Sequence, residues 1–161
     1  MEASGLAGRV LWFSGLWLLV VVGVSCRSVP SLPPADLSAP GWRLQQGQAV
    51  WKPAVNKPEL AGELLLATHT NGDFLIQFTK TPMSLTAAHS VSGRWQIEFG
   101  SRDYVHRGHG QPPARFVWFQ LPRALTGASL GSEWRVGRAA TNTWKLENAR
   151  TGETLEGFLS P

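Results

Sequence analysis

The sequence has a single cysteine, Cys26, among its 161 residues. One cysteine can neither form a disulfide within the chain nor build a zinc site of the multi-cysteine kind. The fold therefore depends on the packing of apolar side chains, and a chain of this length can bury one sizeable core.

The sequence also lacks an apolar run of the ~20 residues that a transmembrane helix needs. The longest uncharged apolar run, Val10 to Val24, has 15 residues and follows the basic residue Arg9. A short apolar run of this kind is typical of a secretory signal peptide, and Cys26 follows its small-residue end. The alternatives are an ordinary cleaved signal or an uncleaved anchor, with Cys26 incidental to both.

The residues before Cys26 resemble the signal of bacterial lipoproteins. Val24 and Ser25 match that pattern, whereas Gly23 stands where the family prefers Leu, Val or Ile. The resemblance implies that residues 1–25 are removed and that acyl chains on Cys26 hold the protein at a membrane. Arg27 replaces the aspartate that retains such proteins at the inner membrane. This implies the periplasmic face of the outer membrane, with the inner membrane or the periplasm as the alternative.

Acidic residues are few, 11 against 15 basic ones, and the formal net charge is +4. The basic side chains are spread along the chain, a distribution that does not favour a nucleic-acid partner. Residues 26–40 are rich in Pro, Ser and Ala and predict an extended tether. We therefore expect one domain, residues 41–161, that acts as a monomer.

The clearest local pattern is a β-hairpin. Residues 63–69 and 73–79 flank the dipeptide Asn71-Gly72, which favours the type I′ turn that joins hairpin strands. Alternation along the second strand predicts that three apolar side chains share one face, those of Phe74, Ile76 and Phe78.

Further strands are expected where apolar and polar residues alternate. In residues 94–99, Trp95, Ile97 and Phe99 share one face, and the pattern returns around Trp144 in residues 143–147. Other expected strands are residues 41–52, 84–91, 134–138 and a last strand that ends at Leu159. The expected fold class is mostly β: an antiparallel meander that forms an open, or half, barrel with one or two short helical segments.

The region between residues 100 and 131 has a different composition. Residues 101–113 contain Gly, Pro and His and predict a loop. Residues 114–121 are largely apolar and predict either a helix or a buried strand that Pro122 ends. The residues that follow predict one helical turn, closed by Gly127 as a C-cap.

No motif in the sequence is sufficient for catalysis. Gly127, Ser129 and Gly131 have the spacing of a nucleophile elbow, but no histidine follows Ser129 as that mechanism requires. His106 and His109 stand three residues apart, but a metal ion would need a third ligand. We therefore expect no enzyme, no metal ion and no cofactor.

The turn around Pro82 carries Met83 directly after a predicted strand. In one interpretation the methionine side chain packs into the core. In the other it is an exposed apolar finger, and its flexible, polarizable side chain suits contact with acyl chains.

The domain also resembles the LolA/LolB group of lipoprotein-localisation factors. The resemblance rests on the lipoprotein signal, the tether, Gly62 to Leu66, and Thr81 to Ser84, where the group has Pro, a protruding apolar residue and a small residue. It implies an open barrel whose apolar concave face holds acyl chains under helical segments. It also gives Met83 the protruding residue's role in moving acylated lipoproteins. The domain is shorter than the group's, and Met stands where Leu is usual. The expected ligand-binding residues are Phe74, Phe78, Met83, Trp95, Ile97, Phe99 and Trp144.

Two functions are compatible with these features. In the first, a membrane-anchored periplasmic lipoprotein binds acyl chains or lipoproteins in an apolar cavity and aids their insertion, with a periplasmic carrier as a further partner. In the second, a non-catalytic assembly lipoprotein docks a protein or glycan through an aromatic sheet face. An apolar pocket would favour the first, and a filled core with an exposed aromatic patch the second.

Because both catalytic motifs are incomplete, Ser129→Ala, or joint replacement of His106 and His109 by Ala, should leave ligand binding unchanged. Titration with an acylated peptide before and after substitution checks this. A large loss of binding would favour a catalytic or metal-dependent role.

Overall fold

The computed structural model describes residues 36–140 and 143–160, apart from the side chains of residues 101–103 and 138–140. The expected signal peptide, Cys26 and the first part of the tether lie outside these residues. Residues 32–161 form a compact unit of the chain. No helix in the described part combines the length and apolar character that crossing a membrane requires.

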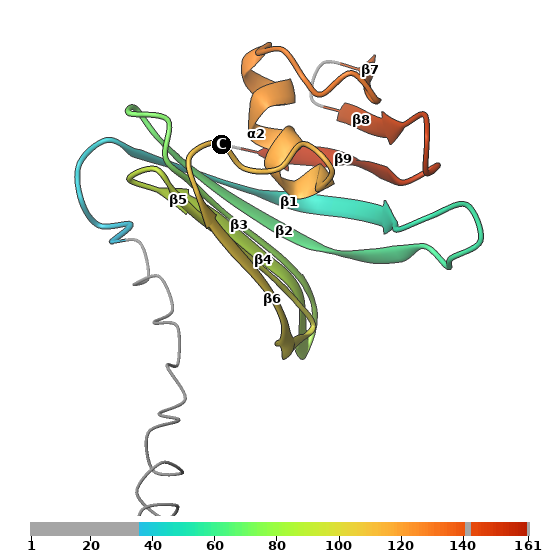
Figure 1. Ribbon diagram of the computed structural model, residues 1–161, viewed down its shortest axis with the longest axis horizontal. Coiled ribbons are helices and arrows are strands. Elements are labelled where there is room, and N and C mark those ends of the chain that lie inside the picture. The colour runs from blue at the N-terminus through green and yellow to red at the C-terminus, as the bar shows by residue number, and fades with distance from the viewer. Residues whose placement is uncertain (1–35, 141–142, 161) are drawn as a thin grey trace, which may run out of the picture. The chain divides into compact units, whose positions relative to one another are not determined.

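Nine strands form one antiparallel sheet (Figure 1). Its order is β6-β5-β4-β3-β2-β1-β9-β8-β7, so the last strand returns to pair with the first and the sheet does not close between β6 and β7. The strands are β1 (Trp42–Lys52), β2 (Leu60–His69), β3 (Phe74–Lys80), β4 (Met83–Val91), β5 (Arg94–Phe99), β6 (Ser101–His109), β7 (Trp134–Ala140), β8 (Thr143–Asn148) and β9 (Thr154–Ser160). This confirms the expected open, mostly β architecture.

The one helix in the described residues, α2 (Val117–Thr126), lies against the inner face of the curved sheet (Figure 1). Alternation along the strands makes this inner face apolar, and an antiparallel sheet must cover such a face to keep it from water. Trp118 packs against Phe78, with ring centroids 5.1 Å apart, and Phe119 packs against Trp95 at 5.7 Å. The core therefore lies between α2 and the sheet.

The helix includes Pro122, so the expectation that this proline ends the apolar segment was wrong. A proline inside a helix removes one backbone hydrogen bond and costs about 3 kcal/mol. Burial of Trp118, Phe119 and Leu121 offsets this, since each large apolar side chain contributes about 1.5–3 kcal/mol. The expected C-cap is confirmed: Gly127 has a φ of 74° and its N–H donates to the Ala124 carbonyl.

Residues 101–109 form strand β6, so the expected loop over residues 101–113 was wrong. Gly108 and His106, two of the residues that indicated a loop, instead pack against Trp95 of β5 and Phe116, the residue before the helix. A Cβ atom at Gly108 would lie 2.3 Å from the Trp95 ring, and the His106 ring packs at a tilt against Phe116, with ring centroids 5.4 Å apart. Only the tertiary environment shows why these residues suit a strand.

The β2–β3 hairpin is confirmed, but the expected type I′ turn at Asn71-Gly72 was wrong. Of these two residues only Gly72 has a positive φ, 93°, and the His69 N–H donates to the Asp73 carbonyl around a three-residue loop. Two successive positive φ values instead occur at Ser92 and Gly93, in the two-residue turn between β4 and β5. That geometry is the one a type I′ hairpin requires.

Trp118→Ala should lower the free energy of unfolding by about 3–5 kcal/mol, because it leaves a cavity between α2 and the sheet. Met83→Ala, at an exposed position, should change it by less than about 0.5 kcal/mol. Denaturant unfolding of residues 32–161 measures both. Similar losses for the two variants would contradict this packing.

Candidate functional site

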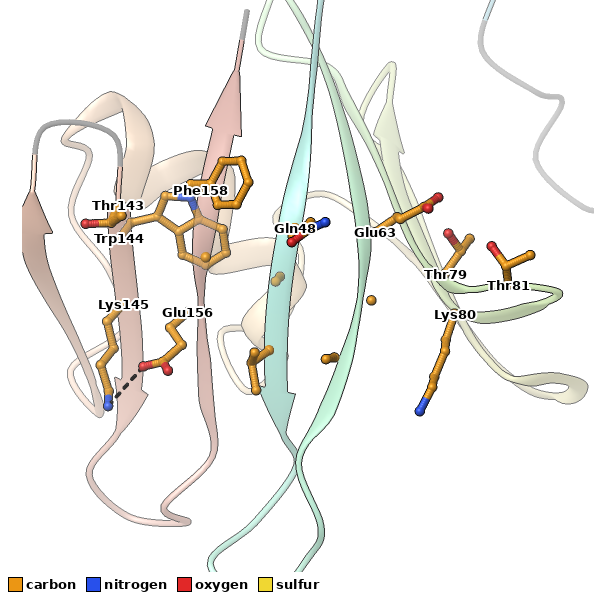
Figure 2. Close-up of a pocket in the computed structure, with 15 residues that line it drawn as sticks. Gln48, Glu63, Thr79, Lys80, Thr81, Thr143, Trp144, Lys145, Glu156 and Phe158 are labelled. Atoms are coloured by element: carbon orange, nitrogen blue, oxygen red, sulfur yellow. Dashed lines mark ion pairs between the residues drawn. The ribbon is translucent and has the colours of Figure 1, made fainter.

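The largest hollow described lies on the outer face of the sheet, the face opposite α2. It measures about 750 Å³ and extends from β8 across β9, β1 and β2 to the end of β3 (Figure 2). Its floor is low near the paired residues Val50 and Ala61, whose side chains are small. A Cβ atom at Gly157 would lie 2.2 Å from the Gln48 carbonyl oxygen, so a larger residue cannot replace this glycine without moving the backbone.

A second hollow of about 430 Å³ adjoins the first and is lined by more polar residues. The two share Gln48, Glu63, Thr79 and Phe158. We call the combined hollow the outer groove. The Phe158 ring is 40% exposed within it.

The charges around the outer groove balance. Lys145 and Glu156 form an ion pair of 3.2 Å on one side (Figure 2). Lys80 and Glu63 lie on the other side, one of each sign. The outer groove therefore has no net charge at neutral pH.

A third hollow, the inner cleft, lies on the inner face between the C-terminal end of α2 and the sheet. It measures about 360 Å³. Its lining is mixed: Leu125 is partly exposed and Leu66 and Leu159 lie buried behind it, while Arg43 and Gln45 add polar groups. This position follows from the length of α2, which ends at Thr126 and leaves the adjoining sheet uncovered.

Trp144 lies between the outer groove and the inner cleft and lines both. The residue is only 5% exposed, and its Nε1 is buried without a hydrogen-bond partner. Trp51 and Trp134 donate their indole N–H groups to protein oxygens, whereas the unpartnered Trp118 Nε1 lies in the core away from the three hollows. An unpaired buried donor costs about 1–3 kcal/mol, so a ligand oxygen that reaches Trp144 Nε1 would be favoured.

Most residues expected to bind a ligand are packed in the core. Phe74, Phe78, Trp95 and Ile97 are buried, and Phe99 is partly buried. The rings among them contact aromatic residues of α2 or the residue before it, and none of the five lines the three hollows. Trp144 belongs to the same buried core but also lines the inner cleft, and Met83 is 59% exposed at the β3–β4 turn.

Apart from Trp144, sequence reasoning missed the residues that line the hollows. The alternation of β9 places Leu155 and Leu159 inside and Phe158 outside, but the sequence Phe158-Leu159 does not reveal which apolar residue is exposed. Gln46, Gln48 and Gln77 carry no motif, and only strand pairing brings them together. The alternation of polar residues along β1 was the one feature of the sequence that could have indicated these glutamines.

The histidines and the serine of the incomplete motifs do not form a site in the structure. His106 and His109 are three residues apart on β6, and residues at an odd spacing on a strand point to opposite faces. Ser129 is exposed in the segment after α2, where its carbonyl oxygen accepts a hydrogen bond from Arg123 Nε at 2.9 Å. No cluster of three metal-ligating side chains occurs among the described residues.

Glu153 is the carboxyl group whose environment departs most from water. Burial raises its pKa from 4.5 to about 7, although a hydrogen bond from Trp51 Nε1, 2.9 Å from Glu153 Oε1, acts in the opposite direction. Trp51 also packs on Phe99 and Trp118, so this carboxyl group lies next to the aromatic core. His89 shows the reverse shift, since burial lowers its pKa.

Comparison with protein-family models finds none that matches this sequence, and comparison with curated proteins finds no significant relative. The function is therefore argued from the chemistry of the hollows.

The raised pKa of Glu153 predicts that its contribution to stability is fully present below about pH 4.5 and is lost as the pH rises through about 7. The folded state then binds a proton that the unfolded state has released. The loss is on the order of 2 kcal/mol, allowing for partial exposure of the carboxyl group.

Glu153→Gln keeps a hydrogen-bond acceptor for Trp51 and removes the titratable carboxyl group. It therefore separates the effect of Glu153 from that of His89, whose contribution to the free energy of unfolding decreases as the pH falls. Unfolding of both proteins at about pH 5 and about pH 8 measures the difference. Equal pH dependence in the two proteins would show that Glu153 titrates normally.

Proposed function

We propose that this chain is a non-catalytic, membrane-anchored protein that binds acyl chains of lipids or lipoproteins. Lipid on Cys26 would hold it at the periplasmic face of a bacterial outer membrane. The observation that carries the proposal is the inner cleft, where leucine side chains lie beside polar groups and Trp144 Nε1 is buried without a partner.

The inner cleft has the two chemical features that an acyl group needs. Leu125 of α2 is partly exposed in the cleft and offers apolar surface to the hydrocarbon, and apolar burial contributes about 25 cal/mol per Å². The ester or amide carbonyl at the head of an acyl chain is a hydrogen-bond acceptor, and Trp144 Nε1 is a donor without a partner. Because Trp144 Nε1 is buried, the indole ring must shift before the carbonyl can reach it.

Met83 provides a separate apolar contact. It pairs with Lys80 at one end of β3, whereas the cleft residue Thr68 pairs with Phe74 at the other end. The two sites are therefore distinct along the strand. An exposed methionine at a hairpin turn is suited to contact with the irregular apolar surface of a lipid or an acylated partner.

A titration of residues 32–161 with a palmitoylated peptide, and with the same peptide lacking the acyl chain, tests the proposal. We expect saturable binding of the acylated peptide alone. Met83→Glu should weaken it, because the new carboxylate must lose water on contact with the acyl chain. Equal responses to the two peptides would rule out acyl-chain binding.

Trp144→Phe tests the hydrogen bond within the inner cleft. It keeps an aromatic ring and removes the N–H group, so binding should weaken about fivefold, the equivalent of one hydrogen bond. The free energy of unfolding should fall by about 1–2 kcal/mol, because the smaller ring leaves space at a buried core position. Leu44→Phe, at an exposed position on β1 outside the inner cleft, is the matched control. Unchanged affinity in Trp144→Phe would place the acyl head group elsewhere.

A further inference from the structure

The outer groove carries a regular array of side chains that the proposed acyl site does not use. Strand pairing aligns Phe158, Gln48, Glu63 and Thr79 in one row across β9, β1, β2 and β3. A parallel row contains Ser160, Gln46, Leu65 and Gln77. Neighbouring strands lie about 4.8 Å apart, so each row presents side chains at a nearly constant interval.

The side chains in these rows are suited to a ligand rich in hydroxyl groups. Each glutamine amide can both donate and accept hydrogen bonds, as a hydroxyl group does. In the part of the chain that the structure describes, Gln46, Gln48 and Gln77 make no side-chain hydrogen bond to protein. These amides are exposed and free to bind a ligand.

The outer groove also offers apolar surface between the polar groups. The Phe158 ring is partly exposed, and Val50 and Ala61 line the larger hollow. A sugar ring has an apolar face of C–H groups and a rim of hydroxyl groups, so it can cover an aromatic ring while it forms hydrogen bonds at its edge. A long acyl chain has no hydrogen-bonding groups along its hydrocarbon part, so it could not pair with the glutamine amides in these rows.

The charge of the outer groove limits the ligand further. Lys80 and Lys145 are balanced by Glu63 and Glu156, and Lys145 and Glu156 already pair with each other. A polyanion would lose water from its charges without gaining a basic surface in return. An uncharged ligand avoids this cost.

We propose that the outer groove binds a neutral linear glycan, with sugar rings laid across β9, β1, β2 and β3, Phe158 under one ring, and the glutamine amides on the hydroxyl groups. This site lies on the face opposite the inner cleft, and Trp144 lines both. A chain that binds both an acyl group and a glycan would link a membrane component to a polysaccharide.

Titration calorimetry of residues 32–161 with cellohexaose, maltohexaose and chitohexaose tests the proposal. We expect saturable binding of at least one of them in the millimolar range or tighter. Phe158→Ala should weaken it about tenfold, because the stacking surface is lost. Gln48→Ala should weaken it about threefold through the loss of one amide.

Leu44→Ala is the matched control, since Leu44 is an exposed apolar residue on β1 that lines neither hollow of the outer groove. Its glycan affinity should equal that of the unaltered protein, and thermal unfolding should show all three variants folded. The proposal is overturned if none of the three neutral glycans binds, or if Phe158→Ala binds them as tightly as the unaltered protein does. It is also overturned if acidic polygalacturonate binds more tightly than each of the three neutral glycans.

Discussion

The structure depends on one contact, the packing of Trp118 and Phe119 of α2 against the aromatic inner face of the sheet. Nine antiparallel strands with one apolar face cannot remain open in water, and the sheet does not close on itself. The ten-residue helix α2 covers the face instead. Because large rings from both sides meet at centroid distances of 5.1–6.0 Å, this contact fixes the position of α2.

The length of α2 then decides where ligands can bind. Aromatic side chains fill the space under the helix, so residues such as Phe78 and Trp95 support the fold. Beyond the end of the helix, the inner cleft adjoins the buried residues Trp144 and Leu159 and the partly exposed Leu125. The outer face differs in chemistry, with glutamine and hydroxyl groups around Phe158. We infer that the two faces serve different ligands, an acyl chain inside and a glycan outside.

The sequence allowed the strands to be predicted where alternation was regular, as in Arg94–Phe99 and around Trp144, because a half-buried strand imposes a period of two. It did not predict β6, whose glycine and histidine are explained only by contact with Trp95 and Phe116. The prediction that Pro122 ends the apolar segment was wrong for a similar reason, because tertiary packing outweighed the cost of a proline within the helix. Of the expected binding residues, Trp144 lines the inner cleft and Met83 is exposed. The alternation along the strands could not show which of the other apolar side chains α2 would cover.

The most direct test of this account is the nuclear magnetic resonance spectrum of the tryptophan indole N–H groups of residues 32–161 during titration with the palmitoylated peptide. Trp144 and Trp118 both have buried Nε1 atoms without partners, but only Trp144 lines a hollow. The account predicts that the Trp144 resonance shifts downfield as it gains an acceptor, while the Trp118 resonance stays in place. A shift of Trp118 equal to or larger than that of Trp144 would show that the ligand enters the core under α2, and would contradict the account.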